Sequence, residues 1–163
     1  MIKSPIQKVT NRLQYRAIGI INGIYQPHDH KKLNRGTLTD INGKKIETVL
    51  LGKALSLIKK YINFEKNYFW IVYPRNKNSQ NLHLQVAGIW DPNQFNKVSI
   101  GSSKKSSSEL LEELNLNDNY FSIRGDIVYV NVAKKEFVVK ICSSNHSMKL
   151  KNGNFKLVVA GEI

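Results

Sequence analysis

The sequence has little cysteine and no long apolar run. Cys142 is the single cysteine among 163 residues, so an intrachain disulfide is excluded and a reducing compartment is indicated. No apolar run approaches the roughly 18 residues that a membrane-spanning helix needs. The first residues, Met1 to Pro5, also lack the apolar centre of a secretory signal peptide. Together these absences predict a cytoplasmic protein.

Acidic residues are scarce as well. The chain has 12 aspartates and glutamates against 25 lysines and arginines, which gives a formal net charge of +13. The excess lies in residues 1–16, 17–90 and 121–163, whereas residues 91–120 are mildly acidic. A charge this far from zero attracts polyanions, first RNA, then DNA and acidic membrane surfaces. The abundance of Lys, Asn and Ile also fits an AT-rich genome, so compositional drift stays open as a source of part of the charge.

Changes in composition along the chain predict four segments. Residues 1–16 form a basic N-terminal tail that wraps the body or stays mobile. Residues 17–92 form a β-rich block, and residues 93–118 form a Ser- and Lys-containing linker with a short helix. Residues 119–163 form a β-meander block, which can pack with 17–92 as one body.

The strongest structural signal is a predicted hairpin with strands at 67–75 and 82–90. Both runs are rich in aromatic and β-branched residues, and a polar loop separates them. Period-2 alternation places His83 and Gln85 opposite a buried face, and Pro74 is expected to end the first strand. The expected buried face consists of Leu82, Leu84, Val86 and Trp90.

Glycines inside the other predicted strands favour a coiled sheet. Gly19 and Gly23 interrupt the strand at 16–25, and Gly125 interrupts the strand at 121–131, where a bulge, a bend or a close backbone approach is expected. Asn42-Gly43 and the turn at 151–154 predict tight hairpins. We therefore predict an α+β fold that is mainly antiparallel β. It is an OB-like small barrel or, alternatively, an open twisted sheet packed on one amphipathic helix.

Two helices are predicted. Residues 51–62 place Leu51, Ala54, Leu55, Ile58 and Ile62 at spacings of three and four, which is typical of an amphipathic helix. A shorter helix at 109–114 follows a capping box, in which Ser106 precedes Glu109 by three residues.

The residues give no catalytic signature. The His28-Asp-His30 loop has too few ligands for a metal site, and Cys142, with His146 nearby, lies in a predicted strand where a buried thiol is usual. The carboxylates Asp40, Glu47, Glu65, Asp126 and Glu136 are too scattered to form a recognisable pair. We predict a protein that is not an enzyme and needs neither cofactor nor metal.

Nucleic-acid binding is the function that the charge favours. Lysines and arginines neutralise phosphates, and aromatic side chains on an exposed strand can stack on bases. Tyr25 and Tyr129 are further stacking candidates, and the absence of a helix-turn-helix or zinc module favours RNA or another single strand over duplex DNA. The candidate contacts are Arg35, Lys53, Lys59, Lys60, Trp70, Tyr73, Arg75, Arg124 and Lys140.

An accessory subunit or adaptor is the alternative. It would dock on a larger ribonucleoprotein, polymerase or membrane-associated complex, with the aromatic hairpin as its interface. This alternative predicts an exposed apolar patch around residues 69–73 and at Ile89 and Trp90. A nuclease-like enzyme is a third hypothesis and requires carboxylates and histidines that converge in a cleft.

Six short phrases of the chain carry a resemblance to known sequences. They begin at Arg16 (RAIGI), Arg35 (RGTL), Leu50 (LLG), Phe69 (FWIVYPR), Gly88 (GIWDP) and Phe121 (FSIRG). Together they resemble an uncharacterised cyanobacterial protein family. The resemblance covers most of the chain from Arg16 to Gly161 and implies a cyanobacterial, plastid or related origin, without an activity to carry over. Members of that family commonly have a basic, proline-rich stretch in or after the last block, where this chain has residues 143–147.

Overall fold

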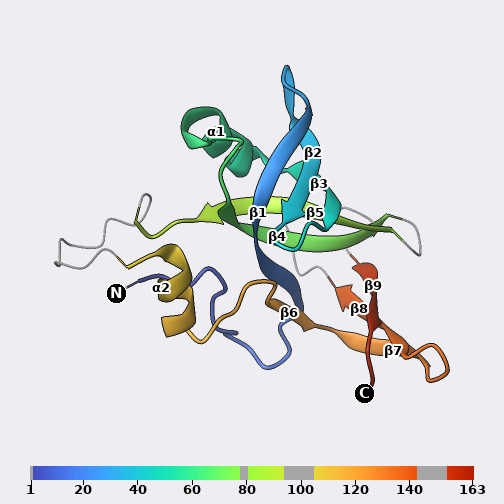
Figure 1. Cartoon of the computed structure of the whole chain (residues 1–163). Helices are drawn as coiled ribbons and strands as arrows, with labels where there is room; N and C mark the ends of the chain where they lie inside the picture. Colours follow the sequence, from blue (N-terminus) through green and yellow to red (C-terminus); the bar gives the residue numbers. More distant parts are fainter. Residues whose placement is uncertain (1, 78–80, 94–104, 143–153) are drawn as a thin grey trace.

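A computed structural model describes residues 2–77, 81–93, 105–142 and 154–163. Five strands form a closed barrel, with neighbours in the order β1, β2, β3, β5, β4 and back to β1 (Figure 1). The β3–β5 pair is parallel and the other barrel pairs are antiparallel. This confirms the predicted OB-like barrel and rules out the open sheet. The strands are β1 (Arg16–Asp29), β2 (Lys32–Asp40), β3 (Lys45–Leu50), β4 (Tyr68–Lys77) and β5 (Asn81–Trp90).

Strand β1 has three partners. Its beginning pairs with β6 (Phe121–Arg124), its middle with β4 and its end with β2. The change of partner occurs at Gly23, where a Cβ atom would lie 2.3 Å from the Thr39 carbonyl oxygen. The expected close approach of backbones at Gly23 is therefore confirmed, because only glycine lets β1 coil here from one neighbour to the next.

Helix α1 (Gly52–Tyr61) connects β3 to β4 and packs into the barrel core. Ala54 and Ile58 are buried there, and Leu55 and Ile62 pack against them, so most of the predicted apolar stripe is confirmed. Leu51 is different, because it precedes the helix and is 37% exposed. The helix therefore begins one residue later than predicted.

The barrel core is apolar and includes two large aromatic residues. Trp70 and Tyr25 are buried side by side, with ring centroids 5.9 Å apart. The Trp70 indole N–H donates to the Gly23 carbonyl oxygen at 2.9 Å, so its one polar group is satisfied inside the barrel. Around them lie Ile21, Leu38, Ile46, Leu50, Val72, Leu84, Val86 and Ile89.

A second apolar cluster lies outside the barrel, beneath helix α2 (Ser107–Glu113). Phe69 and Trp90 are buried there, and the Trp90 indole N–H donates to the Lys3 carbonyl oxygen at 2.9 Å. The predicted capping box of Ser106 and Glu109 begins this helix. The exposed apolar patch expected for a docking hairpin is therefore wrong, because α2 and the N-terminal tail cover these aromatic rings. The cluster also holds Ile6, Ile20, Leu110 and Leu111.

Two expectations for the β4–β5 hairpin are also wrong. Ala87 is an extra residue between the Ile71–Gly88 and Val72–Val86 pairs, so Trp90 faces outward although Val86 faces the barrel core. Leu82, near the start of β5, is 40% exposed.

Pro74 does not end β4 either, because the strand continues to Lys77. Pairing of β4 with β1 stops at Val72, so at Pro74 the strand pairs only with β5 and has a free edge. A proline is tolerated at such an edge.

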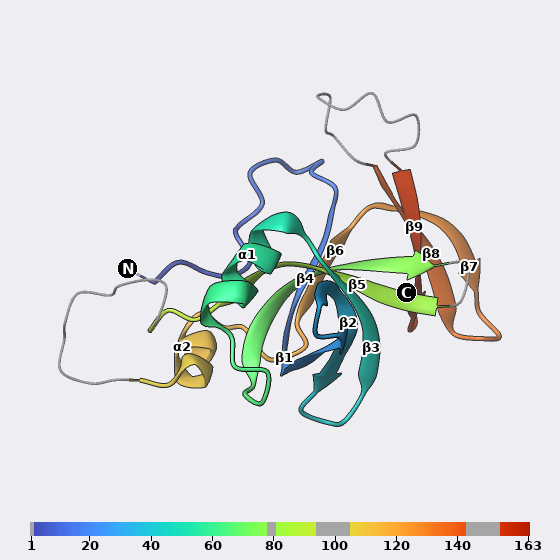
Figure 2. The same ribbon diagram turned by 90° about the horizontal axis from the view of Figure 1, so that it is seen from above.

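The C-terminal block forms a separate three-stranded sheet of β7 (Asp126–Asn131), β8 (Glu136–Cys142) and β9 (Asn154–Ala160). Figure 2 shows it on the side of the barrel opposite to α1 and α2. The predicted single strand over 121–131 is wrong, because it divides at Gly125 into β6, which joins the barrel sheet, and β7. Ala17 of β1 packs with Val139, Ile141 and Leu157 of this sheet.

The N-terminal tail wraps the body in its described part, residues 2–15. Arg124 of β6 donates to the Arg12 carbonyl oxygen at 2.7 Å and to the Gln14 carbonyl oxygen at 3.1 Å. Arg16 donates to the Gln7 carbonyl oxygen at 2.6 Å. No helix among the described residues is long and apolar enough to cross a membrane. Much of the predicted linker, residues 94–104, and the turn at 151–153 lie outside the described residues.

Candidate nucleic-acid interface

The outer face of the barrel brings together residues from four strands. In one row of paired residues Arg35 of β2 lies beside Val49 of β3, then Gln85 of β5 and Tyr73 of β4. Their sequence neighbours Gly36, Thr48, Leu84, Val86 and Val72 are buried in the barrel, so alternation turns this row outward.

A second row runs parallel to the first. It places Thr37 beside Glu47, His83 and Arg75 in the same strand order. With strands about 4.8 Å apart, each row is roughly 14 Å long. We call the surface formed by these two rows the barrel face. It carries an arginine near each end, which suits a chain of phosphates.

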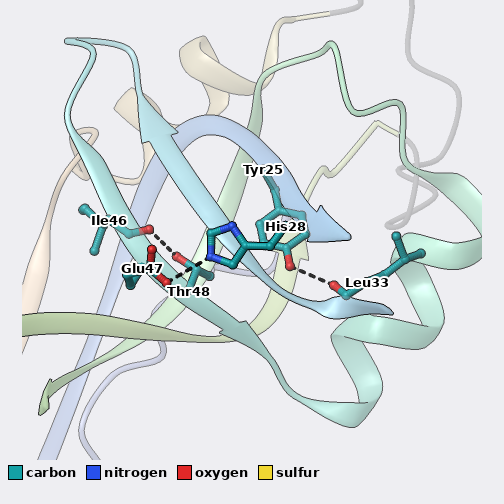
Figure 3. A network of polar contacts seen from close by, with 6 residues as sticks. All are labelled: Tyr25, His28, Leu33, Ile46, Glu47 and Thr48. Atoms are coloured by element: carbon teal, nitrogen blue, oxygen red, sulfur yellow. Dashed lines mark hydrogen bonds and ion pairs between the residues drawn. The ribbon is translucent and has the colours of Figure 1, made fainter. Parts of the chain in front are cut away.

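The part of the barrel face near β1 carries one ion pair. His28 Nε2 lies 3.1 Å from Glu47 Oε2, and both side chains are exposed (Figure 3). The Tyr25 hydroxyl donates to the Leu33 carbonyl oxygen at 2.7 Å, and the Thr48 hydroxyl donates to the Ile46 carbonyl oxygen at 2.9 Å. These bonds fix the strands beneath the face. The predicted loop at His28-Asp-His30 is wrong in its first two residues, because β1 continues to Asp29. The described residues contain no cluster of three metal ligands.

Tyr73 and Arg75 lie where the barrel face meets the C-terminal sheet. The Arg75 guanidinium carbon is 3.8 Å from the centroid of the Phe155 ring and 5.8 Å from that of Tyr73. Its Nη1 donates to the Pro74 carbonyl oxygen at 2.8 Å. Burial lowers the pKa of Arg75 from its ordinary value, but an arginine keeps its charge. A planar cation is thus held between two aromatic side chains.

A cleft of about 640 Å³ opens beside this group. Its walls are the tail, the outer face of β1, β4 and β5, and the ends of β8 and β9. Among the described residues that line it are Gln7, Tyr15, Arg16, Tyr73, Arg75 and Phe155.

The other predicted basic contacts lie apart from the two rows. Lys53, Lys59 and Lys60 are exposed on α1. Arg124 donates to carbonyl oxygens of the tail and therefore has a structural role. Lys140 lies on β8 of the C-terminal sheet, where its backbone is in register with Asp126 of β7 and Lys156 of β9. Of the predicted contacts, Arg35, Tyr73 and Arg75 therefore lie on the barrel face. The predicted basic contacts on α1, β6 and β8 lie outside it.

Two of the aromatic residues predicted to stack on bases are buried, so those predictions are wrong, and a third lies outside the barrel. Trp70 is 0% exposed and Tyr25 is 1% exposed, so neither ring can stack on a base at the surface. Both point into the barrel because its closure gives each strand an inner face that must be filled. Tyr129 is 55% exposed, but it lies on β7, outside the barrel.

Arg16, Tyr15 and Phe155 were not among the residues predicted from the sequence. Arg16 and Tyr15 belong to the junction of the tail with β1, and Phe155 comes from the last strand. No local pattern marks them, because they come to line the same cleft as Arg75 only through the packing of the tail and the C-terminal sheet on the barrel. The basic character of residues 1–16 was the one signal that pointed in this direction.

Comparison with protein families gives one match. Residues 17–97 match the model described as PatR RNA-binding protein, N-terminal OB-fold domain. The matched range begins at the second residue of β1 and contains the rest of the five-stranded barrel with α1. Searches of curated proteins and of solved structures found no match. The family match, the closed barrel with its parallel β3–β5 pair and the basic composition identify this chain as a small RNA-binding protein built on an OB fold.

Proposed function

We propose that the protein binds single-stranded or unpaired RNA along the barrel face, without a catalytic step. The observation that carries this proposal is the pairing register, which sets Arg35 and the Tyr73–Arg75 pair on one outward surface. The arginines, with Lys53, Lys59 and Lys60 of α1 at the end of the barrel, hold phosphates, and Tyr73 stacks on a base. An accessible strand of RNA fits such a face better than a duplex, whose bases are stacked inside.

The ion pairs among described residues support this assignment. They join His28 to Glu47, Lys105 to Glu113 and Lys135 to Glu162, and none of them involves Arg35 or the lysines of α1. Unpaired cations at the surface release counterions when they meet phosphate. We also propose that the protein acts in the cytoplasm. Docking on a larger ribonucleoprotein is compatible with this mode, because α2 lies away from the barrel face and the C-terminal sheet meets that face only at its β4 end (Figure 2).

Salt dependence tests the proposal. We expect the full chain to bind a fluorescent single-stranded RNA more tightly than the matching RNA duplex. With about five phosphate contacts, affinity should fall about 130-fold between roughly 50 and 200 mM salt. Arg35→Ala should weaken binding and reduce the slope of log affinity against log salt by about 0.7.

Lys134→Ala is the matched control, because Lys134 lies in the β7–β8 turn of the C-terminal sheet. It should leave both affinity and slope unchanged. Binding that is insensitive to salt, or an Arg35→Ala variant that behaves as the wild type, would contradict the barrel face as the binding surface.

A further inference from the structure

The cleft beside Arg75 is formed by parts of the chain that are far apart in sequence. Pro5, Gln7 and Tyr15 come from the tail, Tyr73 and Arg75 from β4, and Phe155 from β9. Its volume of about 640 Å³ lies within the usual range of small-ligand sites, about 300 to 1,000 Å³. About half of the lining residues lie outside the matched range 17–97, so the cleft depends on the tail and the C-terminal sheet as well as on the barrel.

The cleft presents a flat stacking surface. The Arg75 guanidinium lies over the Phe155 ring at 3.8 Å, and its bond to the Pro74 carbonyl oxygen fixes its direction. Tyr73 adds a second ring beside it. Aromatic rings and guanidinium planes are the groups on which proteins stack unpaired bases. Because Arg75 already lies against both rings, little of its side-chain freedom remains to be lost on binding.

The charged side chains that line the cleft are all basic among the described residues. Arg16 and Arg75 line it, and no aspartate or glutamate does so among the described residues. Arg16 is held by its bonds to Ser122 Oγ at 2.8 Å and to the Gln7 carbonyl oxygen at 2.6 Å. The nearby Asp126 carboxylate accepts the Tyr15 hydroxyl at 2.8 Å and is not part of the lining. An anionic group is therefore favoured next to the stacking surface.

Position connects the cleft to the barrel face. Tyr73 and Arg75 end the two rows that begin at Arg35 and Thr37, and both also line the cleft. A strand of RNA that crosses β2, β3 and β5 therefore arrives at β4 directly beside the opening. A ligand with a flat ring and an adjacent phosphate fits both the stacking surface and the arginines.

We infer that this cleft holds one unpaired nucleotide of the bound RNA, with its base stacked on the group formed by Tyr73, Arg75 and Phe155 and its phosphate beside Arg16. The inference rests on the proposed function, since the barrel face brings the RNA to the opening. It adds a site outside the barrel, one that a barrel without the tail and the C-terminal sheet does not have.

Two titrations with the full chain test the inference. The first uses a single-stranded RNA decamer followed by fluorescence anisotropy, and the second uses 5′-mononucleotides followed by amide shifts of residues around the cleft. Phe155→Leu and Arg75→Lys should weaken decamer binding by about 5-fold to 150-fold, the range of one stacked base. Both should also reduce the mononucleotide shifts. Phe137→Leu is the matched control, because Phe137 packs in the same sheet but does not line the cleft. It should change affinity less than about 2-fold.

The outcomes separate this inference from the proposed function. Salt-sensitive decamer binding that Phe155→Leu leaves intact overturns the inference and keeps the barrel face. The inference is also overturned if mononucleotides shift the amide signals around the cleft but Phe155→Leu and Arg75→Lys leave the affinity for the decamer unchanged. The occupant of the cleft is then a free nucleotide. Displacement of the decamer from the cleft by an oligoglutamate peptide, with no mononucleotide shifts, assigns the cleft to an acidic protein segment and overturns it too. If the wild type binds no decamer at low salt, the proposed function itself fails. Thermal unfolding of each variant verifies that the fold is intact.

Discussion

Tyr25 shows how one polar atom is accommodated inside the barrel wall. Its ring packs against Trp70, and its hydroxyl donates to the Leu33 carbonyl oxygen at the start of β2 (Figure 3). Burial, and to a lesser extent the charge of Glu47, raises the pKa of Tyr25 to about 12. In the unfolded chain a tyrosine ionises near pH 10. The stability contributed by the neutral phenol is therefore complete below pH 10 and is lost as the pH rises from 10 toward 12.

We predict that Tyr25→Phe flattens the alkaline loss of stability. The free energy of unfolding of the wild type should fall more steeply between pH 10 and 12 than that of the variant. At pH 7 the variant should be less stable by about 1 kcal/mol, because the hydrogen bond to Leu33 is missing. Urea unfolding at several pH values measures both effects. Tyr129→Phe, at an exposed position on β7, should follow the wild type at every pH. Equal alkaline slopes for wild type and Tyr25→Phe would contradict the assignment.

The aromatic side chains also show the limit of reading faces from sequence. Alternation correctly placed Leu84 and Val86 on a buried face opposite His83 and Gln85, but it did not say which aromatic residues of β4 face the inside of the closed barrel. On β4 the inside received Trp70 and the outside received Tyr73. The sequence could therefore identify stacking candidates, whereas the closure of the barrel decided which of them a ligand can reach.

At the level of elements, Gly125 is the point where one predicted strand becomes two. A Cβ atom at this position would lie 2.3 Å from the Lys140 carbonyl oxygen and 2.7 Å from Val139 Cγ1. The chain passes this close to β8 because β6 belongs to the barrel sheet and β7 to the C-terminal sheet. The glycine therefore permits the contact that joins the two sheets.

We predict that Gly125→Ala destabilises the protein by about 1 to 3 kcal/mol, the usual cost of forcing extra atoms into a packed site. Gly52→Ala is the matched control, since a Cβ there meets nothing within 4 Å and lies at the start of α1, where alanine favours the helix. It should leave stability unchanged or raise it slightly. Urea unfolding of the two variants gives the comparison. A Gly125→Ala variant as stable as Gly52→Ala would show that β7 can move away from β8 at little cost.

Elements marked by local chemistry were predicted well. The amphipathic helix, the capping box of α2 and the β4–β5 hairpin all depend on residues within a few positions of one another. The bulge at Ala87, the passage of β4 through Pro74 and the division at Gly125 depend instead on which strands are neighbours in space. Those neighbours are fixed by the barrel as a whole, so no local pattern could reveal them.

At the level of the whole molecule, we propose that the barrel and the C-terminal block fold as one body. Phe121 of β6 packs against the barrel core, and Ala17 of β1 is buried by three residues of the C-terminal sheet. A chain ending at residue 118 should therefore lose at least about 2 kcal/mol of stability, the value of burying one phenylalanine side chain and one alanine methyl group.

Tryptophan fluorescence during urea unfolding measures this loss, since Trp70 and Trp90 both lie in the part that remains. The full chain under the same conditions is the reference. An unchanged midpoint would show that the two blocks are independent.

The net charge of +13 was the most informative property for function, because it depends on composition and not on fold. It indicated polyanion binding but could not locate it, since the basic residues lie on every part of the chain. Register then placed Arg35, Tyr73 and Arg75 together. The cleft could not be predicted, because Gln7, Arg75 and Phe155 are far apart in sequence and meet only after three segments have packed.

The three partners of β1 have a consequence for how the protein is made. Arg16 at the start of β1 pairs with Arg124 of β6, more than 100 residues later in the chain. At a synthesis rate of about 5 to 20 residues per second, this edge of β1 waits about 5 to 20 seconds for its partner on the ribosome. An open strand edge is a template for pairing with other chains, and a charged side chain discourages such pairing. We therefore expect the charge of Arg16 to discourage pairing of the nascent chain with other chains before β6 has been synthesised.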